Sequence, residues 1–218
     1  MTGSPISVIY CSWSSFKKEE WGCIKDVFEL DEKPGYKLGQ LFNLEFRNVP
    51  TTEPLLCDLE KMVSFKVESA YRLVRVPCIV EHAGLVLEGY EEKSFPGGLT
   101  QPMWDALDAP RFVASCSTLS TRATARAVIG YCDGMNIKTF VGETNGSLAA
   151  TPRGSRAFYW DTIFCPDGFD DRTYAEIVGD DRSGLIKKLE VSQSIKALKK
   201  FMAYRLENEP ALFPGRSL

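Results

Sequence analysis

Apolar residues recur along the first half of the chain at two spacings, and these spacings predict alternating strands and helices. A β-branched run over 6–10 predicts a buried strand, followed by a helix that ends near residue 28. Alternation over 41–49 predicts a second strand, and a buried run predicts a third at 76–80. Between these two strands, helical spacing predicts an amphipathic helix with Leu59, Met62, Val63, Val67, Ala70 and Val74 on its apolar face.

The second half of the chain continues the alternation. A helical stretch is expected to begin near Trp104, after a Pro-Gly-Gly turn at 96–98. An apolar strand over 124–132 precedes an Asp-Gly turn at 133–134, which predicts a hairpin with a return strand over 138–141.

Residues 142–176 hold the densest set of turn and aromatic signals, and they predict strand, turn, aromatic cluster, strand, turn and helix start. The helix start rests on a capping box formed by Thr173 and Glu176. The polar residues 178–187 predict a loop, and 207–218 a loose tail. Between them, Ser192 is expected to cap a final helix with Ile195, Leu198, Met202 and Leu206 on its apolar face.

This alternation places the chain in the α/β class. The length of 218 residues suits one domain over 1–218, built as a single body or as two small lobes. A net charge of −3 argues against a protein that coats nucleic acid. The chain has no run of about 18 apolar residues, so no membrane-spanning helix is expected. The expected partners therefore include neither nucleic acid nor membrane.

Cysteine usage and the first residues bear on the compartment. The seven cysteines form no Cys-x-x-Cys pair, and with one histidine they predict reduced thiols rather than a zinc site. The first residues lack a charged start followed by an apolar run, so no secretory signal is expected. We expect a cytoplasmic protein.

Two stretches carry candidate chemistry. The first strand passes into its helix through Ser12 and Ser14, with Lys17 one turn into the helix, and such a helix start favours phosphate binding. The alternative is a surface lysine behind an ordinary helix cap. Farther along, the rings of Phe158 and Trp160 beside Asp161 offer stacking surfaces and a hydrogen-bond acceptor, which a purine base requires. The alternative there is a core strand in which the carboxylate caps a turn.

The order of these motifs resembles the inosine triphosphate pyrophosphatase family, whose members hydrolyse aberrant purine nucleoside triphosphates to the monophosphate and pyrophosphate. The resemblance implies a long twisted mixed sheet flanked by helices, two lobes around a nucleotide cleft, a homodimer, and Mg²⁺ or Mn²⁺ as cofactor. The motifs that carry it are Pro152-Arg153-Gly154, Phe158-Tyr159-Trp160-Asp161, Phe164, Pro166-Asp167-Gly168 and Thr173-Tyr174-Ala175-Glu176.

The resemblance assigns roles to residues in the first half of the chain. Ser12, Ser14 and Lys17 align with a Thr/Ser-Gly-Asn-x-x-Lys phosphate motif, in which Trp13 stands at the glycine position and Ser14 at the asparagine. Glu53 aligns with a metal ligand and Lys66 with a phosphate-binding lysine. These are expectations from the resemblance alone.

A pair of acidic residues follows the third strand in the resembled family, and the second acid is its proposed general base. This chain has Glu81 and then His82 there. Glu81 is a candidate metal or water ligand. His82 is either the base, since imidazoles titrate near neutrality, or the mark of a site that has lost its base.

The base-binding end departs from the family as well. The resemblance implies that Lys188, Ser192, Gln193 and Arg153 contact the substrate, but the family's Ser-His-Arg triplet is Ser192-Gln193-Ser194 in this chain. Gln193 both donates and accepts, so it can read a different base edge. The predicted function is hydrolysis of a non-standard purine nucleoside triphosphate. The alternatives are a nucleotide-binding or sensing protein with impaired catalysis, and a pyrophosphatase directed at a different base.

Overall fold

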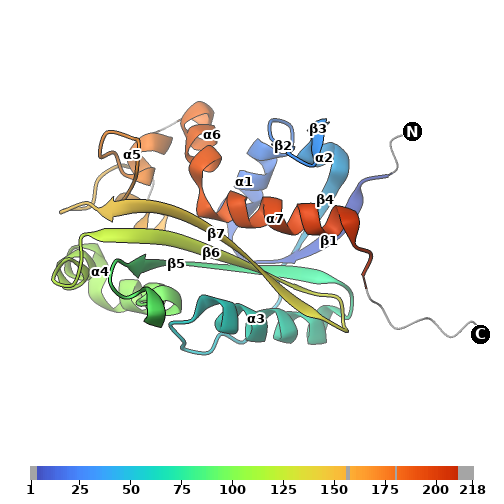
Figure 1. The fold of residues 1–218 in the computed structure, drawn as a ribbon, viewed down its shortest axis with the longest axis horizontal. Coiled ribbons are helices and arrows are strands. Elements are labelled where there is room, and N and C mark those ends of the chain that lie inside the picture. Colours follow the sequence, from blue (N-terminus) through green and yellow to red (C-terminus); the bar gives the residue numbers. More distant parts are fainter. Residues whose placement is uncertain (1–3, 156–157, 180, 211–218) are drawn as a thin grey trace, which may run out of the picture.

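The computed structural model describes residues 4–155, 158–179 and 181–210. Its main feature is a six-stranded mixed sheet in the order β4-β1-β5-β6-β7-β8 (Figure 1). β1 pairs in parallel with β4 and β5, and the later pairs are antiparallel. A short β2-β3 hairpin stands apart from it. The bounds are Ile6–Cys11 for β1, Glu29–Leu30 for β2, Lys33–Lys37 for β3, Phe42–Arg47 for β4, Cys78–Leu87 for β5, Arg122–Cys132 for β6, Ile137–Leu148 for β7 and Phe164–Pro166 for β8.

Helices cover both faces of the sheet (Figure 1). α1 (Ser15–Ile24), α6 (Arg182–Val191) and α7 (Gln193–Glu207) lie on one face, and α3 (Leu59–Val74) packs on the other. α4 (Thr100–Ser117) lies on the same face of the sheet as α3, at the left end of β6 and β7 in Figure 1. The remaining helical segments are short: α2 (Leu38–Leu41), α5 (Tyr174–Val178), and single 3-10 turns at Glu91–Lys93, Gly97–Leu99 and Tyr159–Thr162.

The connections at the carboxyl ends of β1 and β4 create a crevice. β1 leads into α1 on one face of the sheet, whereas its parallel neighbour β4 leads into α3 on the other face. Ligands in open α/β sheets bind at such a reversal, because the two connections separate and leave a gap above the strand ends. β1 also pairs with β5 only as far as Tyr10 and Ile79, so the next part of β5, at residues 81–83, borders the same gap.

The predicted α/β class, with a long mixed sheet flanked by helices, is confirmed, and so is the amphipathic helix over Leu59–Val74. The capping box at Thr173 and Glu176 is present, and Ser192 caps α7 as expected. The first helix ends earlier than expected, at Ile24.

Three predictions of local structure were wrong. The third strand does not end at residue 80 but runs to Leu87, because β6 pairs with it along its whole length. For the same reason the return strand of the hairpin is longer than 138–141 and reaches Leu148. The predicted loop at 178–187 contains most of α6, which begins where the Asp181 side chain accepts a hydrogen bond from the Gly184 amide. The helix buries Gly184, Leu185, Lys188 and Leu189, whereas Arg182, Ser183, Lys187 and Glu190 are exposed.

Two further predictions can be compared with the described residues only. Residues 211–218 of the predicted tail lie outside the described residues. Within the described ranges, no helix has both the length and the apolar character needed to cross a membrane.

Candidate active site

A cavity of about 660 Å³ occupies the crevice above the ends of β1 and β4. Its walls come from the β1-α1 turn, the β4-α3 connection, β5, α4, the turn at Tyr159–Thr162, α6 and the start of α7. Segments far apart in the sequence therefore meet around one space. It brings together twelve of the predicted site residues: Ser12, Ser14, Lys17, Glu53, Lys66, Glu81, His82, Phe158, Trp160, Asp161, Lys188 and Gln193.

The start of α1 faces this cavity. Ser14 caps the helix, with its hydroxyl oxygen accepting from the Lys17 amide, and the Ser14 amide donates to the Ser12 hydroxyl. Ser12, Ser14 and Ser15 line the wall, so the first turn of the helix is directed at the ligand space. Free amides and the helix dipole at such a start favour a bound phosphate.

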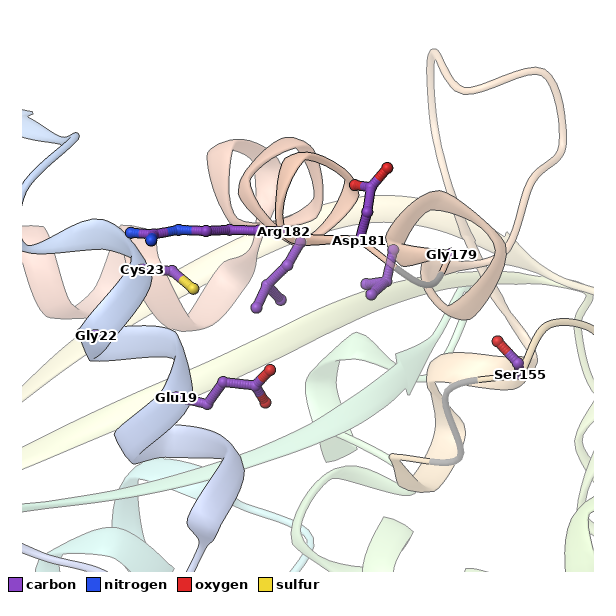
Figure 2. A pocket seen from close by; sticks show the side chains of 9 residues that line it. Glu19, Gly22, Cys23, Ser155, Gly179, Asp181 and Arg182 are labelled. Atoms are coloured by element: carbon purple, nitrogen blue, oxygen red, sulfur yellow. The ribbon is translucent and has the colours of Figure 1, made fainter.

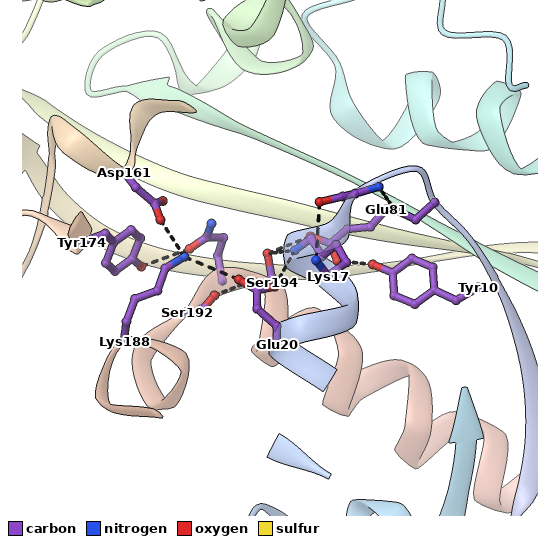
Figure 3. Close-up of polar contacts among 12 residues, drawn as sticks. Tyr10, Lys17, Glu20, Glu81, Asp161, Tyr174, Lys188, Ser192 and Ser194 are labelled. Carbon is purple, nitrogen blue, oxygen red and sulfur yellow. Dashed lines mark hydrogen bonds and ion pairs between the residues drawn. The ribbon is translucent and has the colours of Figure 1, made fainter. Parts of the chain in front are cut away.

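Lys17 extends from the first turn of α1 into a buried set of charges (Figure 3). Its Nζ atom lies 2.6 Å from Oε1 of Glu81, 3.2 Å from Oε2 of Glu20 and 3.0 Å from the Ser194 hydroxyl. Burial by itself would lower the pKa of Lys17, but Glu20 and Glu81 outweigh it and raise that pKa. Lys17 is therefore a fixed cation.

Glu81 receives hydrogen bonds on both carboxylate oxygens (Figure 3). The Tyr10 hydroxyl donates to Oε2 at 2.6 Å, and the Ser194 hydroxyl donates to Oε1 at 2.7 Å. Burial would raise the pKa of Glu81, but Lys17 and these two donors hold it below its ordinary value. Glu81 thus stays ionised and anchors the floor of the cavity.

Removing the Tyr10 hydroxyl is expected to destabilise the protein, because the buried Glu81 carboxylate loses a donor. For Tyr10→Phe we expect the free energy of unfolding to fall by about 1.5–3 kcal/mol, the range for a hydrogen bond to a charged group. Tyr131→Phe is the matched control, because the buried Tyr131 hydroxyl has no hydrogen-bond partner among the described residues. Urea unfolding should show no loss for this control. Equal losses in both variants would contradict the role given to Tyr10.

The depressed pKa of Glu81 also predicts how stability depends on pH. A carboxylate with a lowered folded-state pKa stabilises the fold above its unfolded pKa of about 4.3, and this stabilisation is lost as the pH falls through the folded-state value. The gap in unfolding free energy between wild type and Glu81→Gln should therefore be widest at neutral pH, about 3 kcal/mol, and narrow below about pH 4. The exposed Glu190 provides the control Glu190→Gln, for which no gap is expected. A gap for Glu81→Gln that widens in acid would refute the assignment.

His82 lies on the opposite face of β5 from Glu81, because neighbouring residues of a strand alternate. Its Nδ1 atom is 3.4 Å from Oε2 of Glu53, whose Oε1 is 2.8 Å from the Nζ atom of Lys66. Among the described residues, the buried Nε2 atom of His82 has no hydrogen-bond partner. His82, then Lys66, lower the pKa of Glu53 to about 2. An ionised Glu53 facing Nδ1 favours the tautomer that leaves a lone pair on Nε2.

Lys66 also contacts the edge of β5 that β1 leaves unpaired. Its Nζ atom donates to the Glu81 carbonyl at 3.0 Å, in the region where β1 no longer pairs with β5. This open edge explains how Glu81 and His82 line one cavity although their side chains leave the strand in opposite directions.

The far end of the cavity combines an aromatic face with a buried ion pair. Nζ of Lys188 lies 2.9 Å from Oδ2 of Asp161, and 5.6 Å from the centre of the Phe158 ring. The Phe158 ring itself packs at a tilt against Phe16, with centroids 4.5 Å apart. Trp160 is buried and packs edge-on against Phe164, so its main contacts are with the core although it lines the cavity.

Two predicted substrate contacts do not line the cavity. Arg153 points its guanidinium at Glu176, with Nε 3.1 Å from Oε2, and donates to the Asp171 carbonyl. It ties the Pro-Arg-Gly turn to the start of α5. Ser192 is buried and accepts from the Ser194 amide as the cap of α7, so its neighbour Gln193 lines the wall in its place. Both residues stabilise the segments around the cavity and do not line its surface.

The sequence reasoning missed three residues that organise the site. Tyr10, Glu20 and Ser194 all line the cavity, and Glu20 stands between Lys17 and Lys188, 3.6 Å from the latter. An available signal was the turn of helix that separates Glu20 from Lys17, which places both on one face of α1. Ser194 stands where the resembled family has arginine, and its hydroxyl is directed at Glu81.

The charges of the site restrict the form in which a polyphosphate can enter. Among the residues that line the cavity, three ammonium groups accompany five carboxylates and leave a formal charge of −2, from Lys17, Lys66, Lys188, Glu20, Glu53, Glu81, Asp105 and Asp161. A polyanion entering this space needs an accompanying cation. Within the described part of the chain, no three His, Cys, Asp or Glu side chains form a metal-binding group. These residues suit Mg²⁺, which keeps several waters and binds through one or two carboxylates and the substrate's phosphates.

A second cavity, of about 540 Å³, lies on the other side of α1 between that helix and the α5-α6 junction (Figure 2). Glu19 and Cys23 line it from α1, and Gly179 and Arg182 from the junction. None of the predicted site residues contributes to its wall. Of these two cavities, only the first is lined by predicted site residues.

Comparison with known proteins finds similar sequences and a similar fold. The Ham1 family model matches residues 12–204. The chain is 31% identical to the dITP/XTP pyrophosphatase of Methanopyrus kandleri over 152 aligned residues. The alignment covers 69% of this chain and 76% of that protein. It is 25% identical over 134 residues to inosine triphosphate pyrophosphatase 2 of Trypanosoma cruzi, covering 61% of this chain and 67% of that protein. The structure of a HAM1 protein from Coxiella burnetii superposes with a TM-score of 0.68 at 19% identity, over 93% of this chain and all of that one, and shows the same fold.

Proposed function

Since the chain belongs to the Ham1 family, we propose that it hydrolyses a non-canonical purine nucleoside triphosphate to the monophosphate and pyrophosphate. One observation carries the proposal. Phe158, a helix start suited to phosphate and His82 all line one cavity, and the His82 Nε2 atom has no hydrogen-bond partner among the residues that the structure describes. The family's fold supplies the frame, and these residues supply the chemistry.

Binding uses the two ends of the cavity differently. The base stacks on the exposed part of Phe158, and Asp161, Lys188 and Gln193 present charged and amide groups to its edge. The Gln193 Oε1 atom accepts from the Tyr174 hydroxyl at 3.0 Å, which fixes the amide plane. A site built on such polar contacts rejects a base that leaves them unpaired by on the order of 10⁴-fold.

The phosphates occupy the middle of the cavity, at the start of α1 and near Lys17 and Lys66. Glu53, whose side chain is 40% exposed, is the carboxylate best placed to hold a Mg²⁺ ion brought in by the substrate. Glu81 is less suited to this, because three donors already occupy its oxygens. When bound, the ion supplies neutralisation of the charge that develops on the phosphates.

His82 acts as the general base in this proposal. With Nδ1 held toward Glu53, the Nε2 lone pair takes the proton of a water that attacks the α-phosphorus. The bond between that phosphorus and the oxygen bridging to the β-phosphate breaks, and pyrophosphate leaves. The proton on His82 then returns to solvent.

The test is pyrophosphate release from a panel of ribo- and deoxynucleoside triphosphates, including those of hypoxanthine and xanthine, with Mg²⁺, with Mn²⁺ and with EDTA. We expect the two aberrant purines to turn over fastest and EDTA to abolish release. Turnover of another base alone would mean that Gln193 and Ser194 have redirected the pocket. Tight binding of nucleotides with no pyrophosphate from any of them would make the protein a nucleotide binder.

We further propose that the protein is cytoplasmic and acts as a homodimer. The family resemblance supports the dimer. Seven free cysteines, six of them buried, support a reducing compartment. Sedimentation equilibrium tests the dimer directly, and a single species of 24.4 kDa would reject it.

A further inference from the structure

Trp13 is a large exposed aromatic side chain in the wall of the active-site cavity. It lies in the β1-α1 turn and is 68% exposed, the second-highest value among the exposed large hydrophobic residues. Its indole Nε1 atom donates a 2.9 Å hydrogen bond to the Val49 carbonyl, just beyond the end of β4. An exposed side chain usually samples several rotamers, whereas this bond restrains the indole beside the cavity.

Of the aromatic side chains that line the cavity, only Trp13 and Tyr159 are exposed. The Tyr159 ring packs beside Phe158, with centroids 5.1 Å apart, so Trp13 offers a separate aromatic surface. Phe158 serves the end formed by α6 and the turn at Tyr159–Thr162, whereas Trp13, with Val49 and Thr51, belongs to the end where β1 and β4 finish. The start of α1 connects these two ends: Ser14 and Ser15 lie in the chain between Trp13, which is hydrogen-bonded to Val49, and Phe16, whose ring packs against Phe158. Lys17 and Lys66 line the same cavity. A nucleoside triphosphate has one base, which Phe158 accommodates, so the indole has no role toward that substrate.

A ligand that matches this layout carries a base at each end of a phosphate chain. We infer that Trp13 forms a second base-stacking subsite, and that dinucleoside polyphosphates are a further substrate class of this enzyme. This inference rests on the proposed pyrophosphatase function, because it uses the same catalytic groups. Stacking on an indole suits a second base of any identity, since every base has a π-face.

The reaction is the one proposed for triphosphates, with a larger leaving group. Water attacks the phosphorus attached to the nucleoside whose base lies at Phe158, and the bond from that phosphorus to the next bridging oxygen breaks. The water supplies the new oxygen on the phosphorus and loses a proton to His82. The products are a nucleoside monophosphate and a nucleoside polyphosphate, whose base lies on Trp13 as it leaves. No oxidant or further reactant is required.

The experiment uses a mixed tetraphosphate with inosine at one end and adenosine at the other, alongside inosine triphosphate. Attack beside inosine yields IMP and ATP, which chromatography separates. We expect wild type to cleave both substrates. For Trp13→Ala, the ratio of kcat/KM for the tetraphosphate to that for inosine triphosphate should fall roughly tenfold, as expected for loss of one stacked base. Trp13→Phe keeps a ring but loses the bond to Val49, and should retain most of the ratio.

Phe65→Ala is the matched control, because Phe65 is 53% exposed on α3 and does not line the cavity. It should change neither activity. If wild type hydrolyses inosine triphosphate but not the tetraphosphate, the inference is wrong and the proposed function stands. If wild type hydrolyses neither, both fail. An equal fall for both substrates in Trp13→Ala would overturn the subsite and make Trp13 a support of the β1-α1 turn.

Discussion

Replacing His82 with alanine is expected to lower kcat for hydrolysis of xanthosine triphosphate by roughly 10²- to 10⁴-fold, the contribution of a positioned general base. The reason is geometric. Nε2 is the one His82 nitrogen left without a hydrogen-bond partner among the described residues, whereas Nδ1 faces Glu53 at 3.4 Å. Steady-state kinetics should show the loss mainly in kcat, because the proton is transferred only in the transition state.

His82→Asp is the informative companion variant. It restores the acidic residue that the resembled family has at this position, and so supplies a carboxylate in place of the imidazole. We expect it to recover activity well above that of His82→Ala. A His82→Ala protein that is folded and releases pyrophosphate at the wild-type rate would show that another group acts as the base.

Replacing Lys188 with methionine is expected to cost about 3–5 kcal/mol of unfolding free energy, the cost of removing one member of a buried ion pair. The Lys188 side chain is 3% exposed and lies between Asp161 at 2.9 Å and Glu20 at 3.6 Å, whose side chains are each 4% exposed. Methionine has a similar length but leaves both carboxylates without this cation. Denaturant unfolding measures the loss.

Lys187→Met is the matched control, because Lys187 is the neighbouring residue of the same helix and is exposed. Its unfolding free energy should stay within about 0.5 kcal/mol of wild type. Similar losses in the two variants would mean that the helix, rather than the buried pair, is sensitive to the substitution. We also expect Lys188→Met to weaken nucleotide binding, since this pair lies beside Phe158.

Much of the fold follows from local sequence patterns. The spacing over Leu59–Val74 specifies a helix with one apolar face, and Thr173 with Glu176 specifies where α5 begins. The extent of β5 could not be found in this way, because its second half is held by β6, some 40 residues farther along the chain. α6 was missed because its single buried face is narrow: Leu185, Lys188 and Leu189 are buried beside exposed polar neighbours.

Residues of the candidate site could be predicted where a sequence motif contains them. Their contacts could not be predicted where these depend on tertiary packing. The motifs found Lys17, Glu81, Asp161 and Lys188, but they suggested lysines free to hold phosphates. The structure pairs each of the three cavity lysines with carboxylates, which depends on long-range neighbours such as Glu20. Arg153 illustrates the converse. It lies within a matching motif, yet its partner is Glu176, because the turn folds back onto the start of α5.

The most direct test of the proposed function is hydrolysis of xanthosine triphosphate in ¹⁸O-labelled water, with mass spectrometry of the products. Attack of water on the α-phosphorus predicts one ¹⁸O atom in the monophosphate and unlabelled pyrophosphate. Label in orthophosphate beside a nucleoside diphosphate would mean cleavage at a different bond. Label in the pyrophosphate would mean attack on the β-phosphorus. Either result, or no hydrolysis by a protein that binds the nucleotide, would contradict the account given for this cavity.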